Sequence, residues 1–188
     1  MRRAVWAMGI LCLLAGCQRQ TAAYDPNTAL PKGDPAFPAL TTSWIIDEAG
    51  VLSSATISEG DDICQKLQDD GIAEVAVVVI RGVKHPEEWA THYGRWLRLG
   101  RKGLSTEGGN NGVVWLIRPD AELRMTVSVG RGLPDFTASD YAQIMDAAKD
   151  YLNFNNFDVG VLTIVRGTDK RLRELYGRAN TTRGGAGR

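Results

Sequence analysis

Cysteine and histidine are scarce in this 188-residue chain, which limits the cross-links and metal sites that it can form. The three cysteines are Cys12, Cys17 and Cys64, and only two histidines are present. Cys12 lies in an apolar N-terminal stretch expected to leave on export, and if Cys17 carries lipid, Cys64 has no cysteine left to pair with. The sequence therefore excludes a disulfide framework, and one thiol with two histidines cannot build a standard zinc site.

An excess of charge is also lacking, because 22 basic residues are balanced by 22 acidic ones. Without net positive charge the chain has no electrostatic field for nucleic acid and no polybasic surface for anionic lipid. Beyond the N-terminus, no apolar run is long enough for the roughly 20-residue helix that crosses a bilayer. We therefore expect no nucleic-acid partner and expect any membrane attachment to come through the N-terminus.

The N-terminus has the features of an export signal. Arg2 and Arg3 form a short basic start, residues 4–15 carry no charge, and Leu14-Ala15-Gly16 stands directly before Cys17. A basic region, an apolar core and small residues before the cleavage point are typical of a secretory signal. An ordinary secreted protein with a chance cysteine is one interpretation of this pattern.

The position of the cysteine favours a second interpretation. The segment ending at Cys17 resembles the bacterial lipobox, in which the cysteine is acylated, for example with palmitate, and becomes the new N-terminus. We predict a lipoprotein signal peptide over 1–16 and a lipidated Cys17. Because Gln18 follows, rather than the Asp that retains lipoproteins in the inner membrane, the resemblance implies the periplasmic side of the outer membrane.

Composition divides the remaining chain into three parts. Residues 17–41 mix polar residues with four prolines and lack apolar periodicity, which is typical of a flexible tether that lifts a domain off a membrane. Residues 42–177 are long enough to form one domain that buries about two-thirds of its unfolded surface. Residues 178–188 are rich in glycine, threonine and arginine, and we expect a disordered tail.

Hydrophobic periodicity within this domain predicts four strands and four helices. Continuous apolar runs at 75–80 and 113–117 favour strands covered on both faces, and shorter strands are predicted at 44–46 and 123–129. The residues expected to begin the helices are Ser53, Pro86, Thr137 and Asp158. The order β-α-β-α-β-β-α-α favours an α/β fold, a three-layer α/β/α sandwich with a small mixed sheet of about four strands.

Several polar residues follow or precede these strands at turns. If the first, second and fourth strands run parallel and the third runs opposite, Asp47, Asn110, Asn111 and Arg131 meet at one edge of the sheet. The carboxyl edge of an open α/β sheet is the usual position of a ligand. Each of these residues also suits an ordinary turn, so turn chemistry is the alternative interpretation.

The residue types at this edge suit two kinds of ligand. The carboxylate and amide oxygens of Asp47, Asn110 and Asn111 suit a hard cation, calcium or magnesium. The cationic side chains suit an anion; they are Arg101, Lys102 and Arg131. We therefore predict a metal site and an anion site at this edge of the sheet.

Four segments resemble the TPM-domain family, with order and spacing kept over about 44–166. They are Ile46–Ser53, Leu99–Gly103, Asn110–Ile117 and Val127–Leu133. Such domains occur in bacterial envelope proteins and in a plant thylakoid-lumen protein linked to photosystem II repair. The resemblance implies an α/β/α fold that faces an extracytoplasmic space. Divalent-ion binding and weak acid phosphatase activity are associated with some members.

Two carboxylates common in that family are missing from this chain. Pro134 stands where members commonly have Glu, and Ala138 aligns where they often have Asp. Losing negative charge lowers affinity for a hard cation, and the sequence has no Gly-x-Ser-x-Gly elbow. We expect a lipid-anchored cell-envelope protein that acts by interaction or scaffolding with an unknown envelope protein, with calcium or magnesium as the ion it would bind. A weak metal-dependent acid phosphatase is the alternative.

Overall fold

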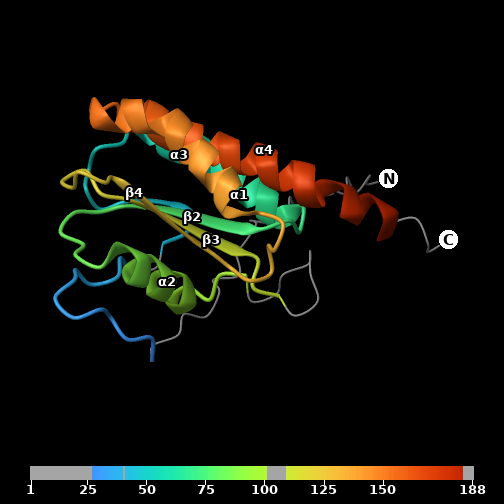
Figure 1. The fold of residues 1–188 in the computed structure, drawn as a ribbon, viewed down its shortest axis with the longest axis horizontal. Coiled ribbons are helices and arrows are strands. Elements are labelled where there is room, and N and C mark those ends of the chain that lie inside the picture. Colours follow the sequence, from blue (N-terminus) through green and yellow to red (C-terminus); the bar gives the residue numbers. More distant parts are fainter. Residues whose placement is uncertain (1–26, 40, 101–108, 184–188) are drawn as a thin grey trace, which may run out of the picture.

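The structure, a computed structural model, describes residues 27–39, 41–100 and 109–183, in which four strands and four helices are found (Figure 1). The strands are β1 (Ile45–Asp47), β2 (Glu74–Val79), β3 (Gly112–Ile117) and β4 (Met125–Val129). The helices are α1 (Ser54–Asp69), α2 (Pro86–Trp96), α3 (Ala138–Asn153) and α4 (Phe157–Arg183). The predicted order of elements is confirmed.

The elements form three layers, with the sheet in the middle. Helices α1, α3 and α4 lie on one face and α2 lies on the other, as Figure 1 shows. Alternate residues of β2 and β3 enter two separate cores: Val77 and Trp115 belong to the larger one, and Val78 and Leu116 to the smaller one with Trp89 of α2. Because both faces are covered, these strands have the continuous apolar runs seen in the sequence. The predicted α/β/α sandwich with a four-stranded mixed sheet is confirmed.

The direction of two strands differs from the expectation. The strand order is β1-β2-β3-β4, with β1, β2 and β3 mutually parallel and β4 antiparallel to β3. The third strand therefore runs with the first two, and the fourth runs opposite. The reason is that α2 joins β2 to β3 as a crossover connection, which produces parallel neighbours, whereas the short turn after β3 reverses the chain.

Residues 31–38, which we call the strap, pack against α2 although the sequence predicts a flexible tether there. The Asp34 carboxylate is fully buried and accepts a hydrogen bond from the backbone N–H of Lys84 at 2.6 Å. The Phe37 ring lies edge-on to Trp89 with 5.3 Å between ring centroids. The expectation of a tether is thus corrected for the strap. Isolated apolar residues between prolines give no periodicity, so their packing could not be predicted.

At the two ends of the chain, the described structure begins after the predicted signal peptide and ends with helix α4. Residues 1–26, which include the predicted signal peptide and Cys17, lie outside the described residues. Helix α4 continues to Arg183, past the predicted domain boundary at 177, which moves the end of the regular structure into the segment expected to be a disordered tail. Among the described residues, no helix combines the length and apolarity needed to cross a bilayer.

Candidate functional site

The polar residues predicted to form one site lie at two opposite ends of the sheet. Asp47 ends β1 beside Val79, at what we call the carboxyl end, whereas Asn110 and Asn111 come just before β3, at what we call the amino end, where Gly112 pairs with Glu74. The length of β2, with a rise of about 3.3 Å per residue, separates these ends by roughly 17 Å. Asp47 and the two asparagines therefore do not form one site, which corrects the prediction.

At the carboxyl end, Asp47 closes the turn that leads into α1. Its Oδ2 accepts hydrogen bonds from the backbone N–H groups of Val51 at 2.8 Å and Leu52 at 2.7 Å. Its Oδ1 is buried and has no hydrogen-bond partner. The next residue, Ser53, caps α1 as predicted, with its side chain accepting from the N–H of Thr56. In the structure, Asp47 therefore stabilises a turn, which was the alternative interpretation to a role in binding a ligand.

Two arginines at this end also bind backbone carbonyls. Arg81 donates to the carbonyl of Ala49 at 2.7 Å, and Arg118 donates to the carbonyls of Val83 and Leu123. The Nε of Arg118 is buried and without a partner. These bonds join the loops after β1, β2 and β3, so both guanidinium groups serve to hold loops together.

The amino end contains a tight junction of backbones. Asn110 has a positive φ of 67°, and a Cβ on Gly130 would lie only 2.1 Å from its carbonyl oxygen. Asn111 is 3% exposed; its Nδ2 donates to the carbonyl of Ile72 at 2.9 Å, while its Oδ1 is buried without a partner. Only a residue without a side chain fits where Gly130 stands.

Of the charged residues near this junction, Glu74 accepts a hydrogen bond and Arg131 is exposed. Glu74 accepts from the backbone N–H of Gly100 at 2.6 Å, which fixes the loop after α2. Arg131 is exposed after β4, on the same end as Asn111. Arg101 and Lys102 lie outside the described residues. The anion site therefore remains a prediction, and Arg131 is the member of it whose position the structure describes.

Three further carboxylates, which were not among the predicted site residues, hold the starts of helices. The Asp34 carboxylate lies at the start of α2, where it also contacts Nδ1 of His85 at 3.3 Å. Asp140 reaches back to the N–H of Thr137 at 2.7 Å in a capping box. Asp158 lies in the first turn of α4. A Ser or Thr followed three residues later by an acid signals a capping box, whereas a lone Asp among prolines gives no comparable signal.

Hydrogen bonds and burial shift the pKa values of Asp158, Asp140 and Tyr93. The backbone N–H of Ser53 donates to Asp158 at 2.8 Å and lowers the pKa of that carboxyl, against the effect of partial burial. For Asp140, burial raises the pKa, but the bonds from Thr137 and Arg171 outweigh it and leave a lowered pKa. Burial is the larger cause, and the charge of Glu48 the smaller, of a raised pKa for Tyr93.

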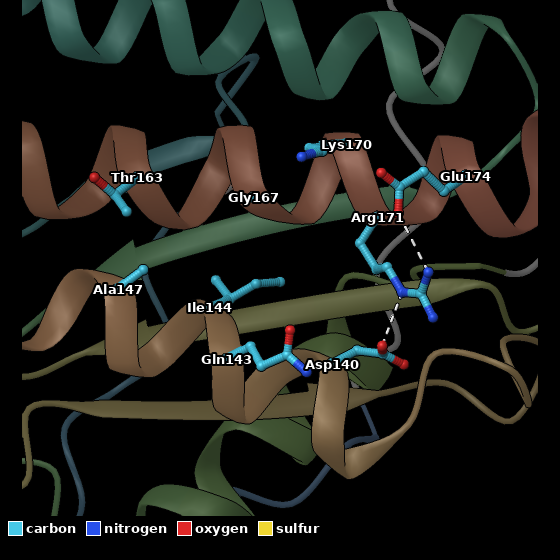
Figure 2. Close-up of a pocket in the computed structure, with 9 residues that line it drawn as sticks. All are labelled: Asp140, Gln143, Ile144, Ala147, Thr163, Gly167, Lys170, Arg171 and Glu174. Atoms are coloured by element: carbon cyan, nitrogen blue, oxygen red, sulfur yellow. Dashed lines mark hydrogen bonds and ion pairs between the residues drawn. The ribbon is translucent and has the colours of Figure 1, made fainter.

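A groove of about 260 Å³ lies between α3 and α4, on the outer side of the helical layer (Figure 2). Its apolar lining comes from Ile144, Ala147 and Gly167. Arg171 at one end donates to Asp140 at 2.8 Å and to Glu174 at 3.2 Å, as the dashed lines in Figure 2 mark. The bond between Arg171 and Asp140 therefore joins α4 to α3 at this end of the groove.

The three residues predicted to hold a divalent ion, Asp47, Asn110 and Asn111, do not lie together in the structure. Within the described ranges, no three His, Cys, Asp or Glu side chains gather closely enough to hold a metal ion. Asp47 and Asn111 each keep one buried oxygen unpartnered, which is the kind of atom a cation would satisfy. These two oxygens stand at opposite ends of the sheet, so they cannot share an ion.

Comparison with known proteins places this fold in a family. A family model described as the TPM domain matches residues 45–171. No curated protein matches the chain. Among solved structures, the chain is similar to the N-terminal domain of a protein from P. gingivalis, with a TM-score of 0.60, 20% identity, and coverage of 72% of this chain and 85% of that one.

Two further solution structures have the same fold. The N-terminal domain of a protein from Corynebacterium glutamicum has a TM-score of 0.51 at 17% identity, covering 71% of this chain and 82% of its own. The BA42 protein from Bizionia argentinensis has a TM-score of 0.55 at 13% identity, covering 69% and 86%. At such low identity these likenesses establish the fold alone.

Proposed function

The chain belongs to the TPM domain family, and we propose that it is a cell-envelope lipoprotein whose domain acts by binding another protein, without catalytic turnover. Cys17 carries the lipid in this proposal, and the domain lies on the periplasmic side of the outer membrane. The support is the apolar signal followed by Leu14-Ala15-Gly16-Cys17. Two or three acyl chains on one cysteine, at roughly 0.8 kcal/mol per buried CH2, give stable attachment.

The interaction role rests on how the carboxylates are used. Five acidic side chains at turns, helix starts and a strand end each accept a backbone N–H; they are Asp34, Asp47, Glu74, Asp140 and Asp158. A carboxylate in such a bond can act as a base or a metal ligand only by giving up the bond, which costs about 1–3 kcal/mol for each buried group left unpaired. This use of acidic groups favours a structural and binding role over hydrolysis.

Fractionation of cells tests the anchor. The wild-type chain is expected in the membrane fraction, and Cys17→Ser is expected in the soluble periplasmic fraction because no thiol remains for acylation. Cys64→Ser is the matched control, since Cys64 is buried in the larger core and should not affect localisation. Sedimentation of Cys17→Ser with membranes to the wild-type extent would contradict lipid anchoring.

A phosphatase assay tests the alternative. The purified chain, with calcium or magnesium added, is expected to hydrolyse a phosphomonoester no faster than buffer does, because these five carboxylates already accept backbone N–H groups. Turnover that disappears in Asn111→Ala while the melting temperature stays unchanged would overturn the interaction role and support a metal-dependent acid phosphatase. The same assay with Asp47→Ala reports on the carboxyl end.

A further inference from the structure

Strand β4 leaves one edge of the sheet open. The carbonyl of Arg124 accepts from Arg118, and the N–H of Gly130 donates to Gly112, so these two residues point toward β3. In an antiparallel pair such residues alternate with residues whose backbone groups point away. The N–H and C=O groups of Met125, Val127 and Val129 therefore face outward, and within the described chain the structure gives them no hydrogen-bond partner.

This edge lacks the protection that exposed strands usually have. Natural edge strands carry charges or proline, or are covered by a helix or loop, because bare edges pair with other strands. The five residues of β4, Met125–Val129, include neither a charge nor a proline. In Figure 1, β4 lies in front of β2 and β3, with α3 passing above it and α2 below it. Helices thus flank this edge on both sides.

The sequence of β4 is symmetric in residue type about its central residue. Thr126 and Ser128 flank Val127 with hydroxyl side chains, and Met125 and Val129 flank these with apolar ones. We propose that two copies of this chain pair through β4, antiparallel, with a two-fold axis at Val127. A two-fold interface places the same patch of both copies in contact, and this strand is complementary to itself in that register.

The register agrees with the directions of the backbone groups. Val127 of one copy faces Val127 of the other, and Met125 faces Val129, so every outward-pointing residue meets another and exchanges N–H···O=C bonds with it. The two sheets become one continuous sheet. Between these pairs Thr126 faces Ser128 across the interface, a cross-strand pair that stabilises sheets.

Side chains and charges around the edge are compatible with the pairing. Met125, Val127 and Val129 are half-buried against the larger core, and a second copy would extend that apolar layer. Thr126 and Ser128 point to the α2 side, where Ser128 lies 3.1 Å from the hydroxyl of Thr91. Just beyond the strand, Arg124 faces Gly130, so like charges do not oppose each other. The pairing rests on the interaction part of the proposed function and is independent of the lipid.

Sedimentation equilibrium of the full chain carrying Cys17→Ser tests the pairing without acyl groups. The mass is expected to rise with concentration to twice the monomer mass, which is 20.5 kDa when all 188 residues are present. Ser128→Lys introduces the charge that protects natural edges and should return the chain to the monomer mass, whereas Ser128→Thr should keep the dimer. A melting curve checks that Ser128→Lys is folded. A monomer at every concentration, or a folded Ser128→Lys that remains dimeric, overturns the proposal.

Cross-linking tests the register itself. Thr126 and Ser128 of different copies form non-hydrogen-bonded pairs, whose Cα atoms lie about 4.5 Å apart, within the limit of about 7 Å for a disulfide. With Cys12→Ser and Cys17→Ser in both chains, a mixture of Thr126→Cys and Ser128→Cys variants should cross-link on mild oxidation, and either variant alone should not, while buried Cys64 stays reduced. Equal cross-linking of one variant alone overturns this register. Failure of lipid anchoring would leave all these results unchanged, so the two proposals fail separately.

Discussion

Individual polar side chains hold the turns of this domain, and the sequence identifies several of them but not their partners. Asp47 stands where expected at the end of the first strand, as the last residue of β1, and Asn111 where expected before β3. Their residue types predict oxygen ligands equally well for a cation or for a backbone N–H, because turns and metal sites use the same groups. Only the strand directions decide which role each residue has, and single residues carry no information about direction.

The role of Asp47 gives a stability prediction. Asp47→Ala should lower the free energy of unfolding by about 1–3 kcal/mol, because the N–H groups of Val51 and Leu52 lose their acceptor. Asp47→Asn should cost less, since its amide oxygen can still accept from both. Urea denaturation of the two variants measures the difference. No loss for Asp47→Ala would show that this side chain does not hold the turn, and equal losses for the two substitutions would show that the charge of the carboxylate, not only its acceptor oxygen, is required.

Among the elements, those with strong periodicity and clear start signals are predicted well. The caps at Ser53 and Thr137 and the proline that begins α2 stand at the helix starts. Asp158 was expected to cap α4, but it lies in the first turn and accepts from Ser53 of α1 instead. The bond links two helices that are distant in sequence, and such a contact has no local signature.

The link between α1 and α4 predicts a pH dependence. The N–H of Ser53 keeps the folded-state pKa of Asp158 below its ordinary value of 3.8. A carboxyl with a lowered pKa stabilises the fold fully above its unfolded-state pKa, and this contribution is lost as the pH falls through the folded-state pKa.

The variant Asp158→Asn should therefore unfold at a lower denaturant concentration at pH 7. Below about pH 4 its stability should fall less steeply with pH than that of the wild type, as followed by denaturation at several pH values. Asp62→Asn, on the exposed side of α1, is the matched control. Parallel pH profiles for Asp158→Asn and the wild type would remove the helix link from the explanation of acid stability.

For the whole molecule, the sequence predicts the fold class correctly but not the directions of the third and fourth strands. Covered strands and the order of elements predict three layers, and the four-stranded sheet has them. The third and fourth strands were predicted to run in opposite directions, and β3 and β4 do so. The prediction of which of them runs with β2 was wrong, and the actual direction of β3 places Asn110 and Asn111 at the other end of the sheet from Asp47. A crossover through α2 was the available physical reason to choose differently.

The strap changes the expected geometry of attachment to the membrane. Asp34 and Phe37 contact the start and the aromatic side chains of α2, so fewer residues separate Cys17 from the first contact with the domain than in the 17–41 tether predicted from composition. A shorter segment reaches less far, at most about 3.3–3.6 Å per residue. If Cys17 is acylated, the domain is held closer to the bilayer than a tether of that full length would allow.

Mass spectrometry of the protein isolated from its own membranes measures the N-terminus directly. Proteolytic peptides should show a chain that begins at Cys17, with acyl groups on that residue and without residues 1–16. A chain that keeps Met1, or one that begins elsewhere with an unmodified Cys17, would contradict a lipid-anchored envelope protein.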